Sequence, residues 1–292
     1  MSRLLLVLLS LVWTGVAMAG TKVATFHPLL SDLVRQVGGD RVEVVDLIST
    51  SGDPHHFEPT PEDLRKATGA KLYLVAGMGL EAYLHSLETI VPAGSHLIEV
   101  GSSLPALHGS CDEPGHDHSH HETDPHWWHS IDRFRRATTV VAEALAAADP
   151  QGAATYRANA AAYRGKLDSL EQWVRLQVAT VPRDRRQLAT THSAFNYFCA
   201  DYGFTPFSVQ GLNQEQDPSP ASLAKLVSEL KEHRVAALFP EVETNPKLLS
   251  VLTRDTGIRL GKPLIADGTN SPTYESMVRH NVTAIVEGLT GK

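Results

Sequence analysis

The chain has 292 residues, with 33 acidic against 26 basic ones, a formal net charge of −7 and two cysteines. The acidic balance argues against nucleic acid as a partner, because binding to phosphates needs a surplus of positive charge. The length exceeds what one hydrophobic core needs and suits two lobes.

The first 19 residues have the pattern of a secretory signal. Arg3 precedes an apolar run over residues 4–12 that is too short to cross a bilayer, and Ala17-Met18-Ala19 has the small-x-small pattern of a cleavage site. We therefore expect a mature, periplasmic chain that begins at Gly20. No cysteine follows the cleavage pattern, so we expect no lipid anchor at that position.

Short apolar runs alternate with helical patterns in the first part of the chain. Pro28 and Pro61 suit the first turns of two helices, and the apolar runs are bounded by Gly, Pro or Ser, as buried strands are. In chain order we expect strands at 22–26, 43–48, 71–75 and 96–100, and helices at 28–37, 61–68 and 80–90. This alternation predicts a parallel sheet covered on both faces.

Two helical patterns without strand signals follow, at 131–148 and 152–181, and Asp149-Pro150 separates them. The second would be about 45 Å long at 1.5 Å per residue, which is the length of two packed lobes. After it, we expect strands at 187–190, 205–209, 235–239 and 263–266, and helices at 194–202, 220–233, 246–256 and 272–289.

We therefore predict an α/β protein of two lobes, each a mainly parallel sheet flanked by helices. The N-terminal lobe would span 20–148 and the C-terminal lobe 183–292, and one rigid helix within 149–182 would join them.

Six histidines lie within residues 108–126. Imidazole is the commonest protein ligand for zinc and its neighbours, and Pro114 and Gly115 disfavour a regular element in this stretch. We expect 108–121 to be a loop that binds additional metal ions weakly. Its candidate ligands are His108, His116, His118, His120 and His121.

The two cysteines, Cys111 and Cys199, lie in this loop and in the second half of the chain. In an oxidising compartment they can form a disulfide that ties the loop to the second half. Free thiols and a pair of soft-metal ligands are the alternatives.

Ligands of open α/β sheets bind at the carboxyl ends of the strands. Histidines or carboxylates follow predicted strands or the loop at four places, two in each half, so they would meet across an interlobe cleft. Three imidazoles and one carboxylate would suit tetrahedral Zn²⁺. The candidates are His55 or its neighbour His56, then His126, His192 and Asp267, with Glu215, Glu241 and Glu243 as reserve carboxylates. His27, before Pro28, is expected to cap a helix.

The motifs together resemble the zinc- and manganese-binding receptors of bacterial ABC importers, over residues 22–290. The resemblance rests on Asp-Pro-His-His-Phe-Glu-Pro at 53–59, Asp-Pro-His-Trp at 124–127, Thr-His-Ser-Ala-Phe-Asn-Tyr-Phe at 191–198, and Asp267. It implies that the ligands are His55, His126, His192 and Asp267, and that His56 is spare. Manganese members often carry Glu where His192 stands, so the resemblance favours zinc.

The function implied is that of a monomeric extracytoplasmic receptor, not an enzyme, which holds one Zn²⁺ tightly in the cleft and delivers it to an ABC permease. A periplasmic metallochaperone is a further candidate partner. The alternatives are a periplasmic zinc buffer or metal-dependent adhesin, and a zinc hydrolase. A hydrolase needs an open metal position for water and a base, and the sequence has no His-Glu-x-x-His arrangement.

Overall fold

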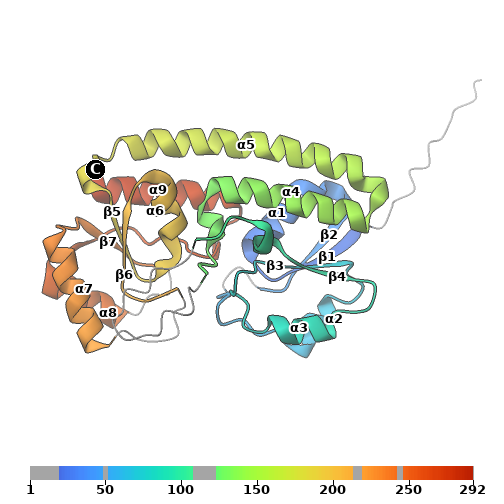
Figure 1. Cartoon of the computed structure of the whole chain (residues 1–292), viewed down its shortest axis with the longest axis horizontal. Helices are drawn as coiled ribbons and strands as arrows, with labels where there is room; N and C mark the ends of the chain where they lie inside the picture. The colour runs from blue at the N-terminus through green and yellow to red at the C-terminus, as the bar shows by residue number, and fades with distance from the viewer. Residues whose placement is uncertain (1–19, 49–51, 108–122, 213–218, 242–245, 292) are drawn as a thin grey trace, which may run out of the picture.

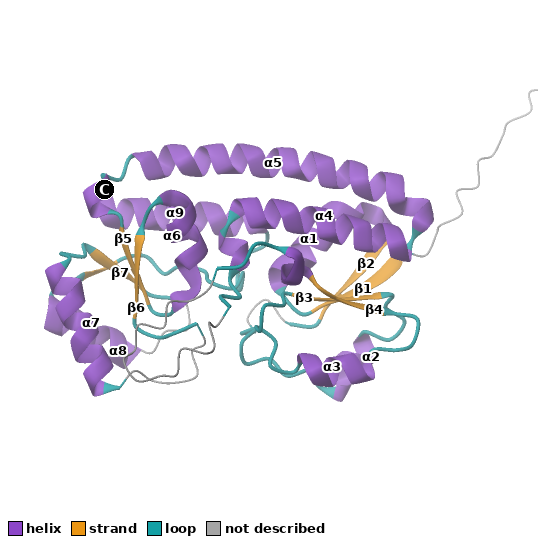
Figure 2. Cartoon of the chain, in the orientation of Figure 1, coloured by secondary structure: helices purple, strands orange, loops and turns teal. Residues whose placement is uncertain are grey.

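The computed structural model describes residues 20–48, 52–107, 123–212, 219–241 and 246–291. Two separate four-stranded parallel sheets lie side by side beneath one long helix that runs over both of them (Figure 1). Figure 2 shows the two sheets, in orange, each with helices packed around it. The predicted fold class is therefore confirmed.

The N-terminal sheet has the order β2-β1-β3-β4, and all its strand pairs are parallel. Alternate residues of β1 and β3 face opposite sides, since Val23 packs toward α1 and Ala24 toward α2 and α3. The elements are β1 (Thr21–Thr25), α1 (Pro28–Gly38), β2 (Val42–Asp46), α2 (Pro61–Lys66), β3 (Leu72–Val75), α3 (Leu84–Ile90) and β4 (His96–Glu99).

The C-terminal sheet repeats this topology in the order β6-β5-β7-β8. Helices α7 and α8 cover one face, while α6 and α9 cover the other. The elements are β5 (Gln187–Thr190), α6 (Asn196–Tyr202), β6 (Thr205–Ser208), α7 (Pro220–Glu232), β7 (Ala237–Phe239), α8 (Pro246–Thr256), β8 (Arg259–Leu260) and α9 (Tyr274–Thr290).

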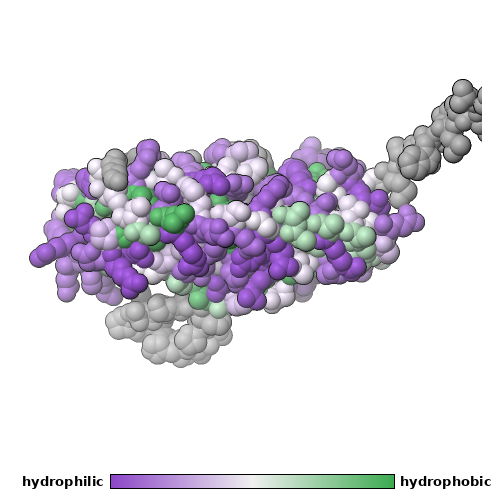
Figure 3. All heavy atoms as spheres, turned by 90° about the horizontal axis from the view of Figure 1, so that it is seen from above, coloured by the Kyte–Doolittle hydropathy of each residue, from purple (hydrophilic) through white to green (hydrophobic). Residues whose placement is uncertain are grey.

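The two lobes share one continuous hydrophobic core beneath the long helix. Helix α4 (Ile131–Ala148) begins at its predicted residue, and α5 (Ala153–Ala179) has 27 residues, which is about 40 Å. Buried residues of α1, α4, α5, α6 and α9 belong to the same cluster. Seen from the side of α5, the surface is mostly hydrophilic with scattered apolar patches (Figure 3), as expected for a helix that buries only one stripe.

The strand predicted at 263–266 is wrong. The fourth strand is instead β8, two residues long, and Leu264 forms only an isolated parallel bridge with Glu241. Gly261 lies so close to the Phe239 ring that a β-carbon there would be 2.4 Å from it, and Pro263 has no N–H to donate. The chain therefore leaves the sheet after β8 and touches it again once, immediately before Asp267.

Candidate metal centre

Three imidazoles converge between the two sheets. The Nε2 atom of His126 lies 3.1 Å from Nε2 of His55 and 3.3 Å from Nε2 of His192. Each of the three rings can keep its other contacts when its Nε2 atom carries no proton. The three lone pairs can therefore be directed at one point, as a bound cation requires.

His55 is positioned by a tight turn. The Oδ1 atom of Asp53 accepts a hydrogen bond of 2.8 Å from the backbone N–H of His55, which is an Asx-type turn. The neighbouring His56 has a side chain that is 54% exposed, and its Nδ1 lies 2.6 Å from Oδ2 of the same aspartate. Adjacent residues in this turn thus point in different directions, and only His55 faces the other imidazoles.

His126 is held by a buried carboxylate two residues before it. Asp124 Oδ1 accepts hydrogen bonds of 2.9 Å from both the backbone N–H and the ring Nδ1–H of His126. Both side chains are almost fully buried. Because Nδ1 carries the proton, Nε2 is the nitrogen with the free lone pair.

His192 is held in the same way by a carboxylate from another strand. It follows β5, and its Nδ1 contacts the Oε2 atom of Glu241 while its backbone N–H donates to Oε1 at 3.1 Å. Glu241 was a reserve candidate for a ligand. The structure places it behind His192, where it fixes the ring orientation and leaves Nε2 toward the centre.

Asp267 completes the cluster from the C-terminal lobe. Its Oδ1 lies 3.8 Å from Nε2 of His55. The turn that carries it needs Gly268, which has φ +77° and lies against Leu29. Trp128 Nε1–H donates to the carbonyl of the preceding residue, Ala266, at 2.7 Å. An indole from the N-terminal half therefore fixes the backbone next to the carboxylate.

Two sets of His, Asp and Glu side chains meet the distance requirement for a metal site within the described ranges. One is His55, His126 and His192, and the other is Asp53, His55 and Asp267. His55 belongs to both sets. The structure thus brings the three predicted histidines together and places Asp267 beside one of them, His55.

Burial keeps two of the imidazoles neutral. It lowers the pKa of His55 to about 4, with the nearby His192 as a second cause, and lowers the pKa of His126 well below its ordinary value. Burial would lower the pKa of His192 as well, but the charge and hydrogen bond of Glu241 outweigh it and raise that pKa. Neutral imidazoles can bind a cation without first losing a proton.

Two more buried histidines surround the centre. His27 caps α1, as predicted, because its Nδ1 accepts from the backbone N–H of Leu29 at 3.2 Å, and its ring packs on Trp128. His129 is buried against Phe195, and burial lowers its pKa to about 3. Sequence reasoning missed His129, although it lies one helical turn beyond His126.

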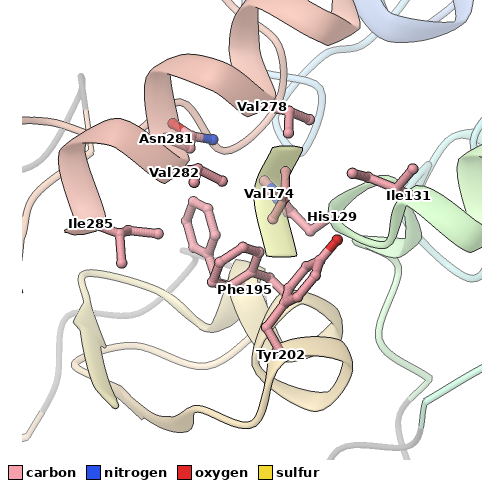
Figure 4. A pocket seen from close by; sticks show the side chains of 10 residues that line it. His129, Ile131, Val174, Phe195, Tyr202, Val278, Asn281, Val282 and Ile285 are labelled. Carbon is pink, nitrogen blue, oxygen red and sulfur yellow. The ribbon is translucent and has the colours of Figure 1, made fainter. Parts of the chain in front are cut away.

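A small cavity lies behind His129, where α5, α6 and α9 meet (Figure 4). Its walls are mainly aliphatic and aromatic, and its volume of about 20 Å³ is enough for a single water. The Nε2 atom of His129 and the hydroxyl of Tyr202, both lining residues, have no hydrogen-bond partner in the described part of the chain. The cavity is too small for a substrate.

Several predicted residues lie outside the described ranges. They are Cys111, Glu215, Glu243 and the five loop histidines, His108, His116, His118, His120 and His121. Cys199 is buried on α6 and forms no disulfide within the described ranges, and its pairing with Cys111 stays a prediction. Away from the centre, His85 pairs with Glu88 and His280 contacts the carbonyl of Pro263.

The sequence matches, over residues 23–288, the family described as zinc-uptake complex component A, periplasmic (ZnuA). It is 29% identical to the manganese-binding lipoprotein MntA of Halalkalibacterium halodurans, over 93% of this chain and 89% of that protein. It is 27% identical to the manganese ABC transporter substrate-binding lipoprotein PsaA of Streptococcus pneumoniae, over 92% of this chain and 88% of that protein.

The structure is similar to the periplasmic zinc-binding protein TroA of Treponema pallidum, with a TM-score of 0.83 and 25% identity over 93% of this chain and 99% of that chain. A Mn-bound periplasmic metal-binding protein from Candidatus Liberibacter asiaticus has the same fold, with a TM-score of 0.84 at 23% identity over 92% of this chain and 99% of that one. Among the described residues, no helix is both long and apolar enough to span a bilayer.

Proposed function

Because the chain belongs to this family of substrate-binding receptors of ABC metal importers, which are not enzymes, we propose that its cargo is Zn²⁺. The observation that carries the proposal is the meeting of three imidazoles, His55, His126 and His192, whose ligand atoms lie within 4.8 Å of one another. Three nitrogens and one carboxylate oxygen suit tetrahedral zinc. Mn²⁺ prefers more oxygen ligands and lies lower in the affinity series.

The proposed ligands are these three histidines and Asp267. The alternative carboxylate, Asp53, already accepts bonds from the backbone of His55 and the ring of His56. Asp267 comes from the C-terminal lobe, and its Oδ1 lies 3.8 Å from Nε2 of His55. His56 is proposed to stay outside the coordination shell, because its exposed ring is bonded to Asp53.

Capture by ligands from both lobes couples the bound ion to the relative position of the lobes. We propose that the movement is small, because α5 and the shared core join the lobes stiffly. The permease would then distinguish the loaded from the empty receptor on surfaces that flank the cleft. A metallochaperone as a second partner and a monomeric state belong to the same proposal.

The loop at 108–121 is proposed to collect zinc weakly through its five histidines and to raise the local ion concentration near the centre. The chain is proposed to act in the periplasm after removal of residues 1–19, because that segment has the pattern of a cleavable signal.

Competitive titration of the metal-stripped protein with Zn²⁺ and Mn²⁺ tests the cargo. We expect Zn²⁺ to win by a wide margin, and His192→Glu to move the preference toward Mn²⁺. Equal affinities in the unaltered protein would overturn the zinc proposal and favour the metal for which MntA and PsaA are named. Zinc-limited growth of cells without the protein separates a receptor from a buffer, since only loss of a receptor slows uptake.

A further inference from the structure

Asp124, the partner of His126, is held from the opposite lobe by two neighbouring residues at the start of α6. Asn196 Nδ2 donates to Asp124 Oδ2 at 3.0 Å, and the Tyr197 hydroxyl donates to the Asp124 carbonyl at 2.9 Å. Both donors belong to the C-terminal lobe, whereas Asp124 and His126 belong to the N-terminal part of the chain. Helix α6 packs directly against the 3₁₀ helix that follows His126.

We propose that Asn196 and Tyr197 are positioning residues for His126, and that the contact between the lobes thereby slows release of the metal. This inference rests on the proposed ligand role of His126. It extends that role to two side chains that do not approach the metal centre themselves.

Both oxygens of the Asp124 carboxylate accept hydrogen bonds. Its Oδ1 accepts from the ring and backbone of His126, and its Oδ2 accepts from Asn196. A carboxylate anchored at one oxygen cannot rotate away from the imidazole bonded to the other. Partners behind a ligating histidine fix its tautomer and ring orientation, and their loss weakens metal binding.

The hydroxyl of Tyr197 contacts the residues on both sides of the histidine-rich loop at 108–121. It accepts from the backbone N–H of Leu107 at 2.9 Å while it donates to the carbonyl of Asp124. The flanks also pair directly, since Asp124 N–H donates to the Leu107 carbonyl at 2.9 Å. The Tyr197 hydroxyl of the C-terminal lobe thus links Leu107 to Asp124, the residue that orients His126.

The ring of Tyr197 is held independently of its hydroxyl. It is fully buried, and the guanidinium of Arg133 lies over it at 4.4 Å from the ring centre. Arg133 also donates to the carbonyl of Pro105 at 2.7 Å. Tyr197→Phe therefore keeps the packing and the cation–π contact, and removes the hydroxyl's hydrogen bonds to Leu107 and Asp124 together with its contact of 3.6 Å to the Met78 sulfur.

A separation of the lobes would carry α6 away from Asp124 and break both bonds together. Asp124 would then be free to turn, and His126 would lose its fixed orientation. Loaded protein with intact bonds is therefore expected to release its ion slowly, and loss of these two bonds should speed release even when all four proposed ligands are present.

The test measures the rate at which Zn²⁺ leaves the full-length protein for an excess of chelator. Tyr197→Phe and Asn196→Ala are each expected to speed release by on the order of 10-fold, the lower end of the effect of partners behind a ligand. Tyr202→Phe is the matched control, because it removes a buried hydroxyl from the same helix that has no partner in the described part of the chain. It should leave the rate unchanged.

Two measurements separate positioning from a general loss of stability. Tyr197→Phe leaves Leu107 N–H and the Asp124 carbonyl without this partner, so its thermal midpoint should fall further than that of Tyr202→Phe, and the release rates are compared at a temperature far below both midpoints. In a His126→Ala background, Tyr197→Phe should no longer change the residual zinc affinity, because its effect acts through His126.

The outcomes distinguish this inference from the ligand proposal. If His126→Ala leaves zinc affinity unchanged, the ligand proposal fails. If His126→Ala abolishes tight binding but Tyr197→Phe and Asn196→Ala release zinc like the control, the positioning role alone is overturned. An effect of Tyr197→Phe that persists in the His126→Ala background also overturns it.

Discussion

Glu241 offers the sharpest test of how the centre is built, because it touches His192 and is not a proposed ligand. Its carboxylate contacts Nδ1 of the ring and accepts the backbone N–H at 3.1 Å. Glu241→Gln replaces the carboxylate facing Nδ1 with a neutral amide, whose oxygen holds the imidazole proton less strongly and whose NH2 group can face the ring in its place. The ring can then turn or change tautomer, and Nε2 no longer presents its lone pair reliably.

The expected cost follows from what is lost. A charge-assisted hydrogen bond in a buried setting contributes about 1.5–3 kcal/mol. Since about 1.4 kcal/mol is a tenfold change in affinity, Glu241→Gln should weaken Zn²⁺ binding by roughly 10- to 100-fold. Glu241→Ala should cost at least as much, because it removes the acceptor of the backbone N–H as well.

The assay is competition against a chelator of known affinity, with the protein stripped of metal beforehand. Glu143→Gln is the control, since Glu143 lies on α4 and pairs only with the exposed Arg157 in the described part of the chain. In combination with His192→Ala, Glu241→Gln should cost little more, because both act on one ligand. An unchanged zinc affinity for Glu241→Gln would refute the reasoning.

His55→Ala should weaken zinc binding by several kcal/mol, since the remaining ligands cannot restore a closed tetrahedron, while His56→Ala should change zinc binding little. A zinc titration in which His56→Ala weakens binding more than His55→Ala would exchange the roles of the two histidines. Deletion of residues 112–121 should leave the affinity of the tight zinc site almost unchanged, because Leu107 and Asp124 pair with each other outside the deleted segment. The deletion should remove the additional, weakly bound zinc ions and slow zinc uptake when zinc is limiting. Unchanged stoichiometry and uptake would show that the loop is only a spacer. Burial raises the pKa of Glu81 from 4.5 to about 7, so the folded state holds the carboxyl proton more tightly than the unfolded state does. The protein's free energy of unfolding should therefore fall as pH rises from about 4.5 to about 7, and this group should account for about 3 kcal/mol of the fall. Urea unfolding of metal-free Glu81→Gln should show a flatter pH dependence than the unaltered protein, and identical slopes would contradict the assignment.

The sequence by itself determined the elements whose signals are local. Strand–helix alternation gave two parallel sheets, and the bounds of α4 and α8 agree with the predicted ranges at 131–148 and 246–256. These segments combine periodic apolar positions with clear start signals, such as Ser130 before α4 and Pro246 at the start of α8. The three histidines and Asp267 were also identified from the sequence, because each follows a predicted strand or lies in an Asp-Pro-His motif.

Only the tertiary structure decided which side chains stand behind the proposed ligands. Glu241 lies 49 residues from His192, and Asn196 lies 72 residues from Asp124. No periodicity in the sequence reports such distances. The error at 263–266 has the same origin, since the apolar run predicts a strand but the chain beyond β8 pairs with the sheet only through the bridge between Leu264 and Glu241. Local patterns fix the elements, whereas the partners of buried polar groups depend on which distant segments packing brings together.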